Sequence, residues 1–184
     1  YDLLYQSAWK TIKTLCADPE NVGAEPGMIA LIHTWGSDMK YHVHLHTLVT
    51  FGGLDKAHNW HFPTRKDKLA PYLAMCREFK KHYLDGIAKL QQKGELKAVP
   101  FMQALIDDVS KVRWVVHNGK PQINTEAIET YLAHYITKIA ISNHRLNFDE
   151  TNEKVQLIYN DYRNQKEGEA APKLSKSLDP LSFI

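Results

Sequence analysis

Residues Tyr41 to Phe51 alternate in polarity with a period of two, which constrains this part of the chain to a β-strand. An apolar, β-favouring run precedes it at residues 28–35, and Gly36-Ser37-Asp38 between the two runs favours a turn. Two such runs joined by a short turn are typical of an antiparallel hairpin. We therefore expect a β-hairpin over residues 28–51, followed by Gly52-Gly53.

The second strand of this hairpin carries a row of histidines. Alternate side chains of a strand share a face, so His42, His44 and His46 point to one side while the residues between them point to the other. Neighbouring members of the row lie about 6.5–7 Å apart and the outer pair about 13 Å apart. Since imidazole nitrogens bind a metal at about 2.1 Å, one ion is expected to take two adjacent histidines rather than all three.

A further histidine lies on the first strand. Pairing the strands around Asp38-Met39 sets His33 opposite His44, and a slip of two residues sets it opposite His42, still on the same face. A single histidine on a strand is usually polar surface or part of the core. Four on one hairpin face are harder to explain in this way, because protonated neighbours repel and neutral ones attract a cation. The hairpin therefore predicts a metal site that includes His33, with the choice among His42, His44 and His46 left open.

A pair of tyrosines stands on a predicted helix over residues 125–136. Tyr131 and Tyr135 are four residues apart, which places both phenols on one helix face, about 6 Å of rise apart. Taken alone, the pair is better explained as part of an apolar stripe. Beside a cation, the tyrosine pair could instead act in catalysis. A phenol is a poor nucleophile at neutral pH, but a metal bound to the phosphate oxygens orients the phosphorus for its attack. The two motifs together suit phosphodiester transesterification.

The remaining periodicity predicts an α+β fold, an antiparallel β-sheet flanked by helices. Apolar residues recur at helical spacing over 1–16, 66–92 and 100–109, and strand-like alternation recurs at 112–116, 138–146 and 154–162. Lys, Glu, Gly, Ala, Pro and Ser dominate from residue 164 onward. We expect a catalytic domain over residues 1–163 and a tail or linker over 164–184.

Composition narrows the class of protein. The 184 residues fit one domain, and 43% hydrophobic with 24% charged residues is close to the globular average. No stretch approaches the roughly 20 apolar residues of a membrane span, and Cys16 and Cys76 cannot build a disulfide framework or a cysteine zinc site, which favours an intracellular compartment. Net charge is only +2, but residues 61–98 and 111–146 are locally basic and could face a polyanion.

At its two motifs the chain resembles the HUH endonucleases (histidine, hydrophobic residue, histidine), which have a Rep/relaxase-like fold. It is most similar to the two-tyrosine transposases of rolling-circle insertion sequences, and the likeness covers nearly the whole chain. The residues that carry it are Leu31-Ile32-His33-Thr34-Trp35-Gly36, His42-Val43-His44-Leu45-His46-Thr47-Leu48-Val49, Gly52-Gly53-Leu54, Tyr131-Leu132-Ala133-His134-Tyr135 and Ile139-Ala140-Ile141-Ser142-Asn143-His144-Arg145-Leu146.

The resemblance implies a single-strand DNA endonuclease and transposase. Its substrates would be single-stranded DNA at transposon ends and target, its intermediate a 5′-phosphotyrosine with a free 3′-hydroxyl, and its cofactor Mg²⁺ or Mn²⁺. Tyr131 and Tyr135 resemble the nucleophile pair, and His44 and His46 the HUH pair. His33 is similar to the third histidine of related relaxases, so the expected ligands are His33, His44 and His46, with His42 as second choice. A cytoplasmic, DNA-associated bacterial protein is implied, and its oligomeric state is left open.

The chain departs from the family at His134 and Lys138, where arginine is frequent, so bidentate grip on phosphate is lost although some positive charge is kept. The family's upstream cysteine-rich zinc segment is also absent from these residues, which together with the non-methionine start leads us to expect a piece of a longer protein. Lys138 and Arg145 are the candidate phosphate contacts. Trp35 and Trp60 are candidates either for stacking on bases or for hairpin packing.

Two other functions fit parts of this pattern. A non-cleaving single-stranded DNA-binding module would keep the fold without the chemistry. A zinc hydrolase would use three histidines to hold a water-activating metal, and its tyrosines would be dispensable.

Overall fold

A computed structural model describes residues 1–184 except 97–99, 123, 137–139, 163, 167 and 184. The chain forms two compact units, each described separately below. Unit 1 comprises residues 1–30 and 47–127, and unit 2 comprises residues 31–46 and 128–184. The β1–β2 hairpin contributes to both units, and the part that carries the histidines, residues 31–46, belongs to unit 2.

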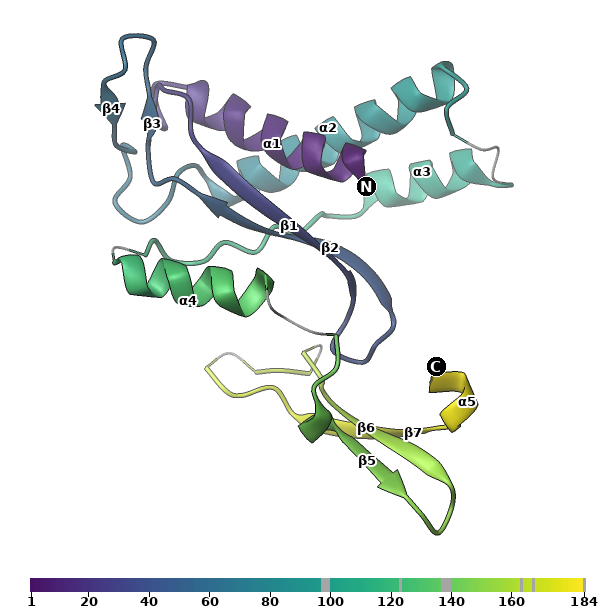
Figure 1. Cartoon of the computed structure of the whole chain (residues 1–184). Helices are drawn as coiled ribbons and strands as arrows, with labels where there is room; N and C mark the ends of the chain where they lie inside the picture. Colours follow the sequence, from purple (N-terminus) through teal and green to yellow (C-terminus); the bar gives the residue numbers. More distant parts are fainter. Residues whose placement is uncertain (97–99, 123, 137–139, 163, 167, 184) are drawn as a thin grey trace. The chain divides into compact units, whose positions relative to one another are not determined.

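Unit 1 is built on two long helices, α1 (Asp2–Ala17) and α2 (Tyr72–Gln92), which lie side by side (Figure 1). The predicted helix over 66–92 begins only at Tyr72, after Pro71 in an extended conformation. A third helix, α3 (Met102–Lys111), follows and contacts α2. One core cluster of the unit is formed by buried small and apolar side chains with two partly buried neighbours, namely Cys16, Val22, Ala24, Ile12 and Leu69.

A short hairpin completes unit 1. Strands β3 (Gly53–Leu54) and β4 (Trp60–His61) are antiparallel, with Gly53 opposite His61 and Leu54 opposite Trp60. Glu25 adds a single bridge to Leu54 through backbone bonds of 2.9 and 3.0 Å. This bridge brings the Glu25 backbone so close to Gly53 that a Cβ there would lie 2.6 Å from the Glu25 carbonyl oxygen. Only glycine fits this position.

The predicted histidine hairpin is present. Strands β1 (Met28–Trp35) and β2 (Tyr41–Val49) pair in a two-stranded sheet. The turn is closed by a bond from the Gly36 amide to the Lys40 carbonyl at 2.9 Å, and Met39 takes a left-handed conformation with φ of 61°. The second strand ends at Val49, two residues before the predicted end, because Thr50 instead bonds Gly27 and Gly52.

Unit 2 contains a three-stranded antiparallel sheet in the order β5 (Leu146–Asp149), β6 (Lys154–Asn160) and β7 (Lys173–Leu178) (Figure 1). Leu157 on the central strand is completely buried. The unit also holds most of α4 (Thr125–Ile136), whose first turn is capped by the Asn124 side chain accepting from the Ala127 amide at 2.7 Å. A short 3-10 turn (Asn143–Arg145) precedes β5, and α5 (Pro180–Phe183) follows β7.

Within unit 2, polar bonds join the tip of the β1–β2 hairpin to this sheet. The Ser37 hydroxyl accepts from the Asn160 amide at 2.8 Å, and the Ser37 carbonyl accepts from the Arg145 guanidinium. The Lys176 ammonium donates to the Asp38 carbonyl at 2.6 Å. The three donors come from three separate segments, and each one satisfies a polar group of the turn. Together these bonds fix the hairpin tip relative to the sheet.

The expected strand over residues 112–116 is wrong, because this segment is extended but pairs with no strand in the described part of the chain. Its Trp114 ring instead packs on α2, with ring centroids 5.6 Å from Phe79 and 5.5 Å from Tyr83. The Val112 carbonyl accepts from the Lys80 ammonium at 3.0 Å rather than from a neighbouring strand. Alternation predicts an extended chain, but it does not supply a partner strand.

The C-terminal strands also differ from the prediction. The expected strand over 138–146 begins only at Leu146, residues 143–145 form a 3-10 turn, and residues 137–139 lie outside the described part of the chain. The strand predicted over 154–162 is β6, Lys154–Asn160. Where the sequence indicated a tail, residues 173–178 form β7 at the edge of the sheet. Much of the surface of this strand is exposed, so its residues can be polar. Its pairing with β6 is made by the backbone and does not require an apolar face, which is why the apolar pattern did not predict it.

The α+β class is confirmed, with small antiparallel sheets and several helices. Among the described residues, no helix has the length and apolar character that crossing a membrane would require.

The close contact at Gly53 gives a test of this fold. Gly53→Ala forces the new Cβ against the Glu25 backbone, so we expect the free energy of unfolding to fall by about 1–3 kcal/mol, as for other overpacked sites. Gly119→Ala is the matched control, since a Cβ there meets nothing within 4 Å and should be neutral or slightly stabilising. Urea unfolding measures both, and equal midpoints for the two variants would contradict the tight β3–Glu25 pairing.

Candidate metal centre and tyrosine helix

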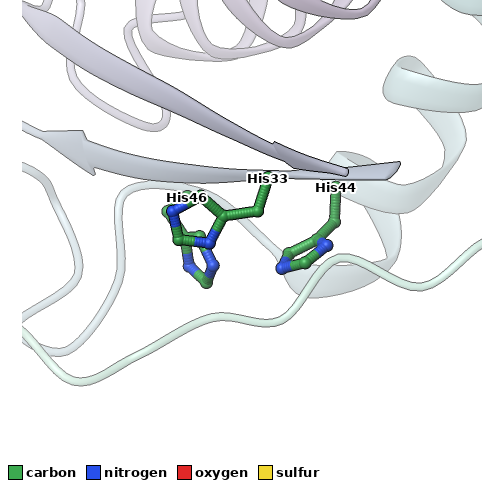
Figure 2. Close-up of side chains that lie close together, drawn as sticks. All are labelled: His33, His44 and His46. Atoms are coloured by element: carbon green, nitrogen blue, oxygen red, sulfur yellow. The ribbon is translucent and has the colours of Figure 1, made fainter. Parts of the chain in front are cut away.

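Three of the four hairpin histidines converge. His33 on β1 and His44 and His46 on β2 project from the same side of the hairpin, and Figure 2 shows their rings grouped beneath the strands. One potential ligand atom from each lies within 4.8 Å of the others. The ring centroid of His33 is 4.7 Å from that of His46 and 5.7 Å from that of His44. The structure thus brings together the three histidines that the sequence favoured.

This donor set fits a metal ion. Two nitrogens bound to one ion at about 2.1 Å are at most about 4.2 Å apart, so rings with donors within 4.8 Å need only a small rotation to share a cation. Three imidazoles suit a borderline ion such as Zn²⁺ better than a hard ion such as Mg²⁺ or Mn²⁺, and they leave further coordination positions open to oxygen ligands.

Backbone carbonyls determine which nitrogen of two of these rings can bind a cation. The Nδ1 of His44 lies 2.9 Å from the His42 carbonyl, and the Nε2 of His33 lies 3.1 Å from the Tyr135 carbonyl. A carbonyl can only accept a hydrogen bond, so these two nitrogens carry the protons. In the neutral form of each ring, the other nitrogen, Nε2 of His44 and Nδ1 of His33, is then the one that can bind a metal, an arrangement frequent in metal-binding histidines.

His42 lies outside this group. Its ring centroid is 5.1 Å from that of His44, its side chain is exposed, and the three-histidine cluster among the described residues does not include it. Its backbone nevertheless contributes, because its carbonyl orients His44. The geometry favours His33 over His42 as the third ligand, and ion binding itself stays a prediction.

Trp35 is packed against the cluster. Its ring stacks on His33 with centroids 4.8 Å apart and an interplanar angle of 15°. The two residues are neighbours on one face of β1, so alternation could have indicated this contact from the sequence. Of the two interpretations for Trp35, the geometry favours hairpin packing, with the indole holding the imidazole of His33 in place. Trp60, by contrast, is 44% exposed on the β3–β4 hairpin.

The tyrosine helix α4 contacts the histidine cluster through Tyr135. The Tyr135 ring stacks on His46 with centroids 3.8 Å apart and planes at 29°, and it lies 6.1 Å from the ring of His33. Tyr131, one helical turn earlier, has its ring centroid 4.5 Å from that of Tyr135. The Tyr135 phenol therefore adjoins two of the three imidazoles, and Tyr131 lies beside Tyr135.

The environment of Tyr131 affects its ionisation. Burial raises the pKa of the Tyr131 phenol above its ordinary value, and negative charge on Tyr135 raises it further. Tyr131 consequently stays protonated at neutral pH unless a neighbouring positive charge stabilises its phenolate.

The structure describes only one of the two candidate phosphate contacts. Lys138 lies outside the described residues. Arg145 donates to three backbone carbonyls: its Nε to Ile158 at 2.9 Å, its Nη1 to Ala140 at 3.3 Å and its Nη2 to Ser37. This geometry gives Arg145 a role in holding the hairpin tip, which the sequence did not indicate. Its contact with DNA stays a prediction.

Comparison with known proteins identifies the family. The model of the family described as "Putative transposase" matches residues 27–183, which include the histidine hairpin and the tyrosine helix. The chain belongs to this transposase family. It is a family of the two-tyrosine HUH type, as the histidine and tyrosine motifs implied.

Two curated relatives support the assignment. The chain is 30% identical over 173 residues to "Putative transposase y4qJ" of Sinorhizobium fredii, covering 89% of this chain and 43% of that protein. It is 27% identical over 150 residues to "Transposase for insertion sequence element IS801" of Pseudomonas savastanoi pv. phaseolicola, covering 78% of this chain and 36% of that protein. The chain thus spans less than half the length of these relatives. No solved structure matches it significantly.

Metal titration tests the three-histidine cluster. We expect His33→Ala, His44→Ala and His46→Ala each to weaken Mn²⁺ binding by about tenfold or more. Removal of a residue that only orients a metal ligand already costs about tenfold, so removal of a ligand should cost at least as much. His42→Ala is the matched control on the same strand, because it keeps the carbonyl that orients His44 and should bind Mn²⁺ as the wild type does. Isothermal titration calorimetry measures the affinities. A larger loss for His42→Ala than for His33→Ala would reverse the ligand assignment.

Proposed function

We propose that this chain is the catalytic domain of a metal-dependent single-stranded DNA endonuclease and transposase that nicks and joins DNA through a 5′-phosphotyrosine intermediate. The observation that carries the proposal is the stacking of Tyr135 on His46, with Tyr131 beside it. Nucleophile and cation site must be neighbours in such a reaction, since both act on one phosphate. Membership of the transposase family supports the same conclusion.

The proposed chemistry is an in-line exchange at phosphorus. A tyrosine oxygen forms a bond to the phosphorus, the bond from phosphorus to the 3′ oxygen breaks, and that oxygen takes up a proton to become a free 3′-hydroxyl. The phenolic proton passes to solvent or a nearby base. His33, His44 and His46 would hold a divalent ion, Mg²⁺ or Mn²⁺, which when bound withdraws charge from the non-bridging oxygens. The reverse exchange, with an incoming 3′-hydroxyl, rejoins the strand.

Two adjacent tyrosines would allow two DNA strands to be cleaved and joined one after the other. One phenol would open the donor strand and the other would accept a second strand, as rolling-circle-type transposition requires. The ring centroids lie 4.5 Å apart, which supports the use of one cation site by both phenols. Negative charge on Tyr135 raises the pKa of Tyr131, which favours ionisation of one phenol at a time. The proposed substrates are therefore single-stranded transposon ends and target DNA, with Lys138 and Arg145 retained as proposed phosphate contacts.

A zinc hydrolase is the second candidate, favoured by the all-imidazole donor set. The three histidines would then hold a zinc ion with an open position for water. The tyrosines would have no chemical role, which is the feature that separates the two functions.

Covalent adduct formation tests the proposal. Wild-type protein with Mn²⁺ and labelled single-stranded terminus DNA should give a denaturation-resistant adduct, in which the fragment on the 3′ side of the cut is joined to the protein through its 5′ phosphate. The double variant Tyr131→Phe, Tyr135→Phe should reduce the adduct to the level seen without protein, and a chelator should do the same. Tyr162→Phe, an exposed tyrosine of unit 2, is the control and should react as the wild type does.

The alternatives give different results in the same assay. Equal adduct from wild type and double variant would refute the tyrosine mechanism. Binding of single-stranded DNA without adduct under any metal would favour a non-cleaving module. Hydrolysis of a non-nucleotide ester that survives the double substitution would favour the zinc hydrolase.

A further inference from the structure

One face of the β3–β4 hairpin in unit 1 is apolar and exposed. Leu54 stands directly opposite Trp60, and Phe62 follows two residues later, with its ring 6.2 Å from that of Trp60 at 75°. The exposed fractions are 44% for Leu54, 44% for Trp60 and 74% for Phe62. Two large aromatic residues are therefore close together with a large part of their surface exposed. This set of three residues is called the aromatic face below.

Polar bonds in the turn stabilise the hairpin. Asp55 accepts hydrogen bonds from the amides of Ala57 and Asn59 at 2.8 and 2.9 Å, and from the His61 ring at 2.9 Å. The bond from His61, followed by that from the Asn59 amide, lowers the pKa of Asp55 to about 2. The carboxylate is consequently ionised at neutral pH, and the turn keeps its shape whether or not the rings are covered.

The Trp60 indole has a defined position. A Cβ at Gly52 would lie 2.7 and 2.8 Å from two carbons of the indole, so the ring packs directly against the Gly52 backbone. Gly52 also has φ of 142°, a conformation that other residues rarely adopt. The indole is thus supported on one side and accessible on the other, which reduces the entropy lost when a planar ligand stacks on it.

Positive charge flanks the aromatic face along the chain. Lys56 lies in the hairpin turn, and Lys66 follows Phe62 by four residues. Both are exposed, and among the described residues no carboxylate lies within ion-pair distance of either. Arg65 is already engaged with the Glu20 carbonyl and the Asn21 side chain. The segment therefore offers two exposed lysines that form no ion pair among the described residues, close in the sequence to two exposed rings.

We infer that the β3–β4 hairpin is a base-stacking platform for single-stranded DNA, with Trp60 and Phe62 contacting bases and Lys56 and Lys66 contacting phosphates. Exposed rings with nearby cations match the two repeating features of a single strand, accessible base faces and a charged backbone. In duplex DNA the base faces are stacked and inaccessible to the rings. An apolar protein partner would gain nothing from the two lysines, so single-stranded DNA fits this surface better than either. The inference rests on the proposed function for the identity of the strand as DNA.

Binding without cleavage provides the test. An oligothymidylate of about 16 nucleotides is titrated with protein in a chelator, and affinity is read from fluorescence anisotropy. We expect Trp60→Ala and Phe62→Ala each to weaken binding by about five- to hundredfold, the range for losing one stacked base. Trp60→Phe should retain most of the affinity. Phe148→Ala removes a 59% exposed ring from β5 and is the matched control, with wild-type affinity expected.

Two further measurements separate stacking and charge from a general loss of structure. Quenching of tryptophan fluorescence by the oligonucleotide should be reduced in Trp60→Phe even though binding persists. The double variant Lys56→Gln, Lys66→Gln should weaken binding and lower its dependence on salt concentration. Unfolding midpoints close to wild type would establish that the variants are folded.

Several outcomes would overturn the inference. These are no binding of the oligonucleotide by the wild type, unchanged affinity in both Trp60→Ala and Phe62→Ala, or equal affinity for a duplex of the same length. A change from dimer to monomer on Trp60→Ala, measured by light scattering, would instead identify the aromatic face as a contact between copies. Failure of the proposed function looks different: aromatic-dependent binding would persist while no tyrosine adduct forms.

Discussion

The contact between the end of α4 and the histidine hairpin is the interaction on which the candidate site depends. Tyr135 makes it twice: its carbonyl accepts a hydrogen bond from His33 on β1, and its ring stacks on His46 of β2. One residue therefore connects both strands of the hairpin to the tyrosine helix. Without this contact the histidines would still share a strand face, but no phenol would lie beside them. The period of the strands brings the imidazoles to one face, and the helix places phenols beside them.

The surroundings of the cluster hold its shape before any ligand binds. Trp35 stacks on His33, and the His42 carbonyl fixes the ring of His44, so two of the three rings have a set orientation. Farther along the hairpin, Arg145 and Lys176 bind carbonyls of the turn and tie it to the three-stranded sheet. Rings whose orientation is already fixed need little reorganisation to accept a cation.

Much of this arrangement followed from local sequence pattern. The period of two gave the hairpin and the shared histidine face, and the spacing of Tyr131 and Tyr135 gave their common helix face. The residues that sequence reasoning placed wrongly depend on distant partners. The segment around Trp114 alternates like a strand, yet it packs on α2, and the polar run at 173–178 pairs with β6 through its backbone. The choice of His33 over His42 likewise depended on how the side chains converge, which strand spacing alone left open.

The close spacing of the two phenols limits how they can act. Negative charge on Tyr135 raises the pKa of Tyr131, in addition to the effect of burial, so the two phenolates disfavour one another. A single cation beside the pair can then stabilise one phenolate readily and both only at greater cost. Under the proposed mechanism, a phosphodiester on one tyrosine still carries one negative charge, so the neighbouring phenol continues to need a positive charge beside it in order to ionise. The close spacing therefore makes both phenols depend on the same cation site, which favours two strand cleavages in sequence over two at once.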